Sequence, residues 1–314
     1  MASPIQFYRN FQALMRDHGL RHVLTSGMAC VDYGIQQNTK DTDWIIHPDD
    51  LEKLLAMLCQ CERGLTGTNW RVSYRSLFGA PFLKEYHQGG WTTHIAIHDE
   101  PSSPEHHLDF FGKPPRVPLA DVFATAKGYL ASRNTIAQMK KTDRDKDWPM
   151  VEAISMQMEN DWNVLLHLRS PERLSTTWQQ CPEETKSTLA MRRPLLSILE
   201  SGAVPLPKAL AIERLIWEQV NKQRYRRFQS EWKEFLRRWK TDPNHEWPVE
   251  CPFAQQHEIL VHAGQAFHLP ANPLGDTIAK EKLIEHAILA VLEVFDGNES
   301  LVRQLTPPTS ELLP

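Results

Sequence analysis

The hydrophobic period of the chain changes once, near residue 115, and this change restricts the folds that are available to it. Before that point several short segments alternate apolar and polar residues, as half-buried strands do. After it, apolar residues recur every three or four positions, which is typical of helices that are buried on one side. Apolar residues make up 41% of the 314 and charged residues 24%, so both parts can form a folded core. We therefore expect an α+β fold, with a short mixed sheet first and an all-helical region second.

The hydrophobic periodicity and the positions of glycine and proline predict where the strands and helices lie. The predicted strands are 21–25, 42–47, 70–74, 91–97 and 106–111. Helices are predicted for the segment that ends at Gly19, for 27–34, and from Pro48 through Leu58. Further helices are predicted at 119–140, 144–168, 184–200, 206–240, 254–267 and 276–295. We expect an α/β domain over 1–118, a helical domain over 119–305, and a frayed tail over 306–314.

Charge and cysteine content narrow the functional classes. The formal net charge of -4 is too small to direct the whole molecule to nucleic acid, although local basic patches can still do so. The five cysteines form no recognisable pair of zinc knuckles, and free thiols suit a reducing compartment. The N-terminal segment has no apolar signal core, and no window reaches the ~18 apolar residues of a membrane span. We expect a cytoplasmic protein with no membrane partner.

Three aspartates are the strongest candidates for chemistry. Asp41 and Asp43 are two residues apart at the start of a predicted strand, so their side chains lie on the same face. Carboxylates that share a face repel each other unless a cation lies between them, and Mg²⁺ (or Mn²⁺) prefers such oxygen ligands. Asp109 lies between two apolar residues in another strand, and it would join the pair if the strands were adjacent. Such a site can hold two metal ions for phosphoryl transfer. Alone, an Asp-x-Asp motif more often marks a turn or a solvated strand end.

A turn of small residues precedes this pair. Ser26 and Gly27 follow one strand and open a short helix, which lets backbone N–H groups approach a phosphate. Residues 26–46 resemble the opening motif of the nucleotidyltransferase superfamily, the polymerase-beta-like fold; their sequence is SGMACVDYGIQQNTKDTDWII. The shared features are the small pair, Ala29, Gly34, the Thr39 of a T-x-D-x-D motif, and the later strand HLDFFG. The resemblance covers residues 20–112 and extends more loosely to 150.

The resemblance implies Mg²⁺-dependent transfer of a nucleoside monophosphate from a triphosphate, ATP among them, to a hydroxyl group. The acceptor stays open among a protein, a tRNA and a small molecule. The metal-binding and catalytic residues would be Asp41, Asp43 and Asp109, with Asp109 nearest the attacking hydroxyl; Ser26, Gly27 and Thr39 would bind the nucleotide. The chain departs from the family at two places. Ser26 stands where the family usually has glycine, and Gln36 and Gln37 stand where it often has a basic residue.

The next segment resembles the helix pair that follows the catalytic core in bacterial nucleotidyltransferases of the abortive-infection toxin (AbiEii-like) type. It spans residues 122–154. By this likeness Lys127 would contact a nucleotide phosphate, and Arg144, Lys146 and Asp147 would match an R-x-K-D nucleotide-binding pattern. A toxin–antitoxin or phage-defence role is implied. The same acidic residues before an apolar run are also typical of a helix N-terminus, and both interpretations stay open.

Two further hypotheses belong to other classes. The chain could be a nucleotidyltransferase-like module that senses a nucleotide or binds a protein without turnover. Alternatively, the basic stretch 221–240 could dock RNA or a protein, although its aromatic residues form one helical stripe that is more typical of a core. Four histidines lie near the proposed site: His94, His98, His106 and His107. We expect them to pack or to support the site, because imidazole suits zinc more than magnesium.

Overall fold

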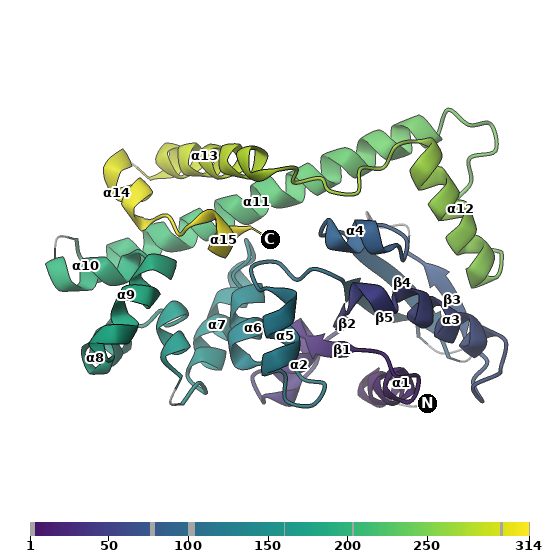
Figure 1. Cartoon of the computed structure of the whole chain (residues 1–314), viewed down its shortest axis with the longest axis horizontal. Coiled ribbons are helices and arrows are strands. Elements are labelled where there is room, and N and C mark those ends of the chain that lie inside the picture. Colours follow the sequence, from purple (N-terminus) through teal and green to yellow (C-terminus); the bar gives the residue numbers. More distant parts are fainter. Residues whose placement is uncertain are drawn as a thin grey trace. The chain divides into compact units, whose positions relative to one another are not determined.

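The fold class agrees with the sequence. The structure is a computed structural model that describes residues 4–75, 79–99, 104–159, 161–202, 204–295 and 298–313. It contains a five-stranded mixed sheet and many helices, among them a long C-terminal helical region (Figure 1). The prediction of an α+β fold with a short mixed sheet followed by helices is confirmed at this level.

The sheet brings together strands that are far apart in the sequence. Its strands are β1 (His22–Thr25), β2 (Asp41–Ile46), β3 (Arg71–Tyr74), β4 (Thr92–His98) and β5 (His106–Phe111). They lie in the order β1-β2-β5-β4-β3. The β2–β5 pair is parallel, and the other neighbouring pairs are antiparallel. The two strands that carry the candidate aspartates are therefore direct neighbours in the middle of the sheet.

One face of the sheet is covered by apolar side chains. The helices of the N-terminal part are α1 (Pro4–Asp17), α2 (Ser26–Asp32), the 3₁₀ helix η1 (Pro48–Asp50), α3 (Leu51–Glu62) and α4 (Lys84–Gln88). The ring of Phe11 in α1 lies 6.1 Å from the rings of both Trp44 and Phe110, on the sheet face that these two residues share. Because side chains alternate along a strand, Asp43 and Asp109 point to the other face.

The chain folds into two compact units whose limits differ from the predicted boundary at residue 118. The first unit comprises 1–114, 118–131 and 227–273, and the second comprises 115–117, 132–226 and 274–314, each within the described residues. The first unit takes in α12 (Phe253–Ala266), whose Gln256 side chain donates to the carbonyl of Val72 and accepts from the N–H of Tyr74. Sequence periodicity predicts this helix but not that it returns to the sheet.

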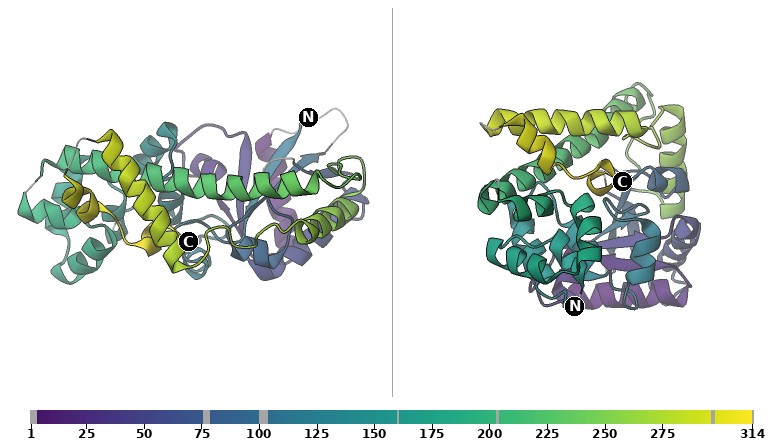
Figure 2. Two further views of the ribbon diagram at one scale, coloured as in Figure 1. Left: turned by 90° about the horizontal axis from the view of Figure 1, so that it is seen from above. Right: turned by 60° about the vertical axis from the view of Figure 1, so that its left-hand side comes forward.

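The longest helix, α11 (Leu206–Trp239), contributes residues to both units and matches the predicted 206–240 (Figure 2). Its aromatic stripe joins the core of the first unit. The rings of Phe228 and Trp232 lie 4.9 Å and 6.3 Å from the ring of Trp91. The interpretation of the stripe as core is confirmed for Phe228, Trp232, Phe235 and Trp239, whereas Tyr225 is exposed.

The second unit is helical. Besides part of α11, its elements are α6 (Arg133–Met139), η2 (Asp145–Asp147), α7 (Trp148–Ser155), η3 (Trp162–Leu166), α8 (Pro171–Gln180), α9 (Glu183–Arg192), α10 (Leu195–Ser201), α13 (Thr277–Val294), α14 (Glu299–Leu305) and α15 (Thr309–Leu312). The prediction of a frayed tail is wrong for residues 306–313. Leu312 and Leu313 are buried in the core of this unit, and Glu311 accepts hydrogen bonds from Arg192 and Gln138. An apolar pair near the end of the chain anchors it there.

The predicted helix over 119–140 is interrupted. It consists of α5 (Leu119–Thr125) and α6, separated by a turn in which Gly128 has a φ of +64°. The N–H of Leu24 donates to the carbonyl of Tyr129 (2.7 Å), and the N–H of Ala131 donates to the carbonyl of Leu24 (2.9 Å). The segment thus satisfies the outer edge of β1, which a continuous helix could not do.

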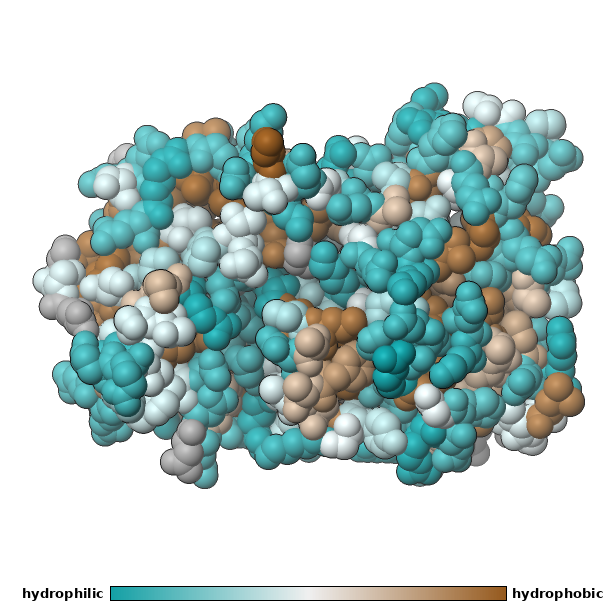
Figure 3. All heavy atoms as spheres, in the orientation of Figure 1, coloured by the Kyte–Doolittle hydropathy of each residue, from teal (hydrophilic) through white to brown (hydrophobic). Residues whose placement is uncertain are grey.

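The drawn surface is largely polar. Figure 3 shows mostly hydrophilic side chains on one face, with apolar side chains in small groups between them. Among the helices that the structure describes, none combines the length and the apolar character that crossing a membrane requires.

Candidate functional site

The sheet register places the three aspartates on one face of the first unit. Asp43 is the register partner of Asp109 across the parallel β2–β5 pair, and Asp41 is two residues before Asp43 on the same strand. Neighbouring strands are ~4.8 Å apart, so the carboxylates of register partners come close together. The condition set by the sequence, that these two strands be adjacent, is met. The Asp41 side chain is 50% exposed and that of Asp109 is 17% exposed, so the group lies at the protein surface.

Asp109 is held by two basic side chains. Its Oδ1 lies 2.6 Å from His94 Nδ1 and accepts a hydrogen bond of 3.4 Å from Arg75 Nη1. His94 is the register partner of Asp109 on β4, so the sheet itself sets this contact. Sequence reasoning expected only a supporting role for His94 and missed Arg75. The sequence signal that could have identified Arg75 is its position as a basic residue directly after the alternating strand 70–74.

Asp41 has a histidine neighbour of its own. His107 Nδ1 lies 3.3 Å from Asp41 Oδ1, and His107 Nε2 lies 2.8 Å from Glu105 Oε2. The adjacent His106 points the other way and stacks on Phe7, with the ring centroids 3.7 Å apart. Strand alternation therefore places one histidine of this pair beside the carboxylates and the other in the core.

The charges of the three aspartates affect the pKa of the nearby Tyr8 hydroxyl. This hydroxyl donates to the carbonyl of Lys40 over 3.1 Å. Burial raises the pKa of Tyr8, and the negative charges of Asp41, Asp109 and Asp43 raise it further. The three carboxylates thus create a local negative field at this end of the sheet.

The Ser26–Gly27 turn begins at the end of β1, next to Asp43 of β2. Thr25 is the register partner of Asp43, and Ser26 follows it with a φ of +53°. This left-handed backbone costs a non-glycine residue about 1–2 kcal/mol, so the serine is locally strained. Such local strain is frequent at functional sites.

The loop between the turn and the aspartates packs directly on Gly27. A Cβ atom at this position would lie 2.7 Å from Thr39 Oγ1, so a larger residue would force the Thr39 side chain to shift. Gln36 Nε2 donates to the carbonyl of Gly27 (2.6 Å), and Thr39 Oγ1 donates to the carbonyl of Asp41 (3.0 Å). Gln36, which stands where the family often has a basic residue, therefore holds the loop against the turn.

Lys127 lies in the turn between α5 and α6, not in a helix as predicted. Its side chain is exposed. Its backbone exchanges hydrogen bonds of 3.0 Å and 3.2 Å with Leu130, which is bridged to Leu24 of β1. The turn that carries Lys127 therefore lies along the outer edge of the strand that leads into Ser26.

The R-x-K-D residues belong to the second unit and are described within it. Asp147 is fully buried and accepts hydrogen bonds from Lys140 Nζ (3.1 Å), Thr142 Oγ1 (2.6 Å) and Arg144 Nε (2.7 Å). Burial alone would raise its pKa, but Lys140, Thr142 and Arg144 outweigh that effect and lower it. These contacts tie together the turn between α6 and α7. Asp147 is the N-cap residue of α7, but its side chain makes no cap hydrogen bond, so the helix-cap interpretation is not confirmed for it. Lys146 is exposed.

The described residues contain no ready-made metal site. Nowhere in the described ranges are three or more His, Cys, Asp or Glu side chains arranged so that they could hold a metal ion. The contacts explain this, because Asp109 is turned toward His94 and Arg75, and Asp41 toward His107. The donor types on this face nonetheless suit a hard cation such as Mg²⁺.

The basic stretch 221–240 forms a solvated helix surface with ion pairs of its own. Glu234 accepts from both Arg237 and Arg238, and Arg227 pairs with Glu231. These pairs engage three of the basic residues of the stretch, Arg227, Arg237 and Arg238.

No protein-family model, curated protein or solved structure matches the chain. The chemistry of the site is therefore inferred from its own geometry.

Proposed function

We propose that the protein is a nucleotidyltransferase that depends on Mg²⁺ or Mn²⁺ and moves a nucleoside monophosphate from a triphosphate to a hydroxyl group of an acceptor. The observation that carries the proposal is the register of β2 and β5, which sets Asp43 beside Asp109 with Asp41 on the same face. The order of parts also supports it: strand, Ser26–Gly27 turn, short helix, Asp-x-Asp strand and, later, a parallel strand with the third aspartate.

The charges of the site favour a cationic ligand. Three carboxylates share this face, and the ion-pair partners of Asp109 and Asp41 include Arg75 and two histidines. Oxygen donors of this kind suit Mg²⁺, which in such enzymes polarises the phosphate and stabilises the leaving pyrophosphate. Binding requires Asp109 to turn from Arg75 and His94 toward Asp43, a change of side-chain rotamer that leaves the backbone register intact.

The remaining groups receive roles from their positions. Gly27 and Thr39 would present backbone and hydroxyl groups to the triphosphate, with the exposed Lys127 as a point charge on it. Asp109, once turned toward Asp43, would accept the proton of the attacking hydroxyl. Once Asp109 has rotated away, Arg75 would be available to the phosphates. A nucleotide-binding role for Arg144, Lys146 and Asp147 is supported only by the family resemblance.

The test is incubation of the purified protein with each α-labelled nucleoside triphosphate, Mg²⁺ and cell lysate. We expect label on one acceptor class for the wild type and none for Asp43→Ala. Electrophoresis and thin-layer chromatography would separate a protein, a tRNA and a small molecule. Equal labelling by Asp43→Ala would show that the site is assigned wrongly.

A second candidate function is a nucleotide-sensing or protein-binding module without turnover. The observation that favours it is the engagement of Asp109 by Arg75 and His94, which leaves no metal cluster among the described residues. Isothermal titration with ATP, GTP, CTP and UTP, with and without Mg²⁺, separates the two functions. Tight binding that does not depend on Mg²⁺, without transfer, would support the module.

A further inference from the structure

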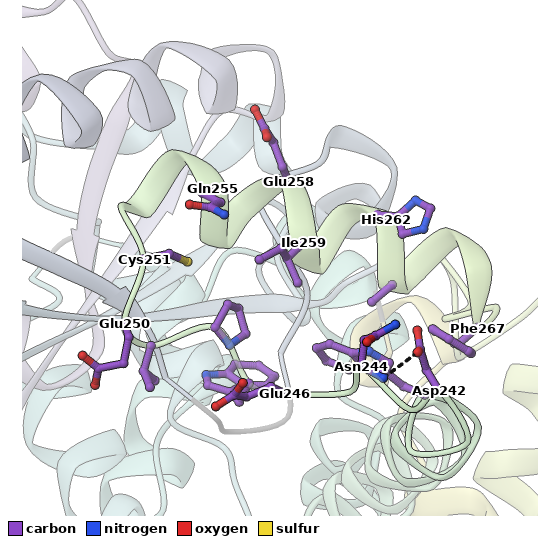
Figure 4. A pocket seen from close by; sticks show the side chains of 15 residues that line it. Asp242, Asn244, Glu246, Glu250, Cys251, Gln255, Glu258, Ile259, His262 and Phe267 are labelled. Carbon is purple, nitrogen blue, oxygen red and sulfur yellow. Dashed lines mark hydrogen bonds between the residues drawn. The ribbon is translucent and has the colours of Figure 1, made fainter.

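A cavity of about 630 Å³ lies within the first unit, away from the aspartates. Its walls come from the end of α11, from the connecting segment 240–252 and from α12 (Figure 4). This volume is within the ~300–1,000 Å³ that small-molecule sites have. Phe253 of α12 contacts Phe82, which contacts Phe110. Phe110 points to the sheet face opposite to that of Asp109, so the cavity is separate from the carboxylate site.

The lining of the cavity is negatively charged. It contains four carboxylates and neither lysine nor arginine: the four are Asp242, Glu246, Glu250 and Glu258. Of these four carboxylates, only Glu250 has an ion pair with another described residue, namely Arg71 at 3.7 Å. Asp242 accepts a hydrogen bond from the backbone N–H of Asn244, which fixes its position without neutralising it (Figure 4). A ligand that enters here meets an uncompensated negative field.

Aromatic rings form a fixed wall of the same cavity. The rings of Trp239 and Trp247 lie 6.1 Å apart at 52°. Trp247 Nε1 donates to the carbonyl of Tyr74 over 3.2 Å, and its ring contacts that of Trp232 edge to face. Hydrogen bonding and packing therefore hold the indole in place before any ligand arrives. Indole faces attract organic cations through the ring quadrupole.

We propose that this cavity binds a small organic polycation of the polyamine class. Its ammonium groups would pair with Asp242 and Glu246, and its methylene segments would lie against the indoles. A divalent metal fits less well, because no three acidic groups of the described chain converge on one point. A polyamine carries its charges apart from one another, as Asp242 and Glu246 do at separate points of the connecting segment. The inference does not depend on the nucleotidyltransferase proposal.

The test is isothermal titration of spermidine into the full chain at low salt and at about 0.15 M salt, where screening is stronger. We expect one binding site that weakens as salt rises. Glu246→Gln should weaken binding about two- to fivefold, and Asp242→Asn/Glu246→Gln at least about tenfold. Trp247→Leu should weaken it about two- to fivefold. Glu234→Gln, which removes an exposed carboxylate of α11 outside the cavity, is the matched control and should change nothing.

The location of the bound spermidine is tested through two free cysteines. Cys251 lines the cavity, and Cys59 lies outside it. Spermidine should slow alkylation of Cys251 by iodoacetamide and leave the rate at Cys59 unchanged, as measured by mass spectrometry. The proposal is overturned by absent spermidine binding, by binding that the double variant retains, by tighter binding of Mg²⁺ that the double variant loses, or by tighter binding of a lysine-rich peptide. Circular dichroism of each variant establishes that it is folded.

Discussion

Two sets of carboxylates in this protein differ in how their charge is balanced. The sheet carboxylates, Asp41, Asp43 and Asp109, are gathered by strand register on a partly exposed face. The core carboxylates, Asp147 and Glu213, are each enclosed by cationic donors in the second unit. Glu213 accepts two hydrogen bonds of 2.7 Å from Arg193 and a further one from Arg169.

The difference separates charges that the fold pairs internally from charges that we propose to bind a cation. A fully buried carboxylate is stable only when donors surround it, because burial of an unpaired charge is very costly. The sheet carboxylates share one partly exposed face, an arrangement that is compatible with a site for a cation. Removal of a carboxylate from each set should therefore have opposite consequences.

The largest expected effect is on the sheet carboxylates. Asp43→Asn should lower nucleotide transfer by about a thousandfold or more, because it removes a proposed charged metal ligand. Its free energy of unfolding should change little, since Asp43 is only partly buried. Initial rates with the labelled triphosphate and urea unfolding measure the two quantities. Loss of stability together with activity would place Asp43 in the structural class instead.

Glu213→Gln should be the most destabilising change among the core carboxylates. It leaves the buried guanidinium groups of Arg193 and Arg169 without their counter-charge, which costs about 3–5 kcal/mol. Urea unfolding followed by circular dichroism would measure the loss. Glu234→Gln is the control, because this exposed residue also accepts from two arginines yet should show no measurable change. Similar values for the two variants would refute the distinction.

Asp147→Asn tests whether this residue acts in the fold or on the nucleotide. The substitution weakens three hydrogen bonds to a buried charge and should cost about 2–3 kcal/mol of stability. Nucleotide affinity, measured by isothermal titration of the folded variant, should not change. A variant that keeps its stability but loses nucleotide affinity would support the role that the family resemblance implies.

A smaller effect on the free energy of unfolding is expected when the pH is lowered. Burial, together with the positive charges of Lys141, Arg193 and Arg192, lowers the pKa of His167 well below that of the unfolded chain. The folded state therefore binds fewer protons, and its stability should fall as the pH drops below about 6.5, by up to about 1.4 kcal/mol per pH unit. His167→Gln should reduce this slope between about pH 6.5 and 4.5.

Glu213 contributes in a separate, more acidic range. Burial would raise its pKa, but the charges of Arg193 and Arg169 outweigh burial and lower it to about 2. Its contribution is present above the unfolded value of about 4.5 and is lost as the pH falls toward 2. Unfolding free energies measured at intervals from pH 7 to pH 3 would resolve both ranges. A profile that does not change on His167→Gln would contradict the first.

The sequence by itself determined which side of each element is apolar. Alternation in 42–47 and 106–111 predicted that Asp43 and Asp109 lie opposite to Trp44 and Phe110, because a strand turns successive side chains to opposite faces. The stripe from Phe228 to Trp239 was recognisable as core for the same reason, with a helical period. Such patterns are local, and they survive in any arrangement of the elements.

Only the tertiary structure decided which elements meet. Strand β5 lies between β2 and β4, which places Asp43 on one side of Asp109 and His94 on the other. The outer edge of β1 needs hydrogen-bond partners, and residues 129–131 supply them at the expense of the helix predicted over 119–140. Burial of Glu213 likewise depends on Arg169 and Arg193, donors that are distant in the sequence. A local pattern records that a side chain is to be buried or exposed, whereas the partner that satisfies it is chosen by long-range packing.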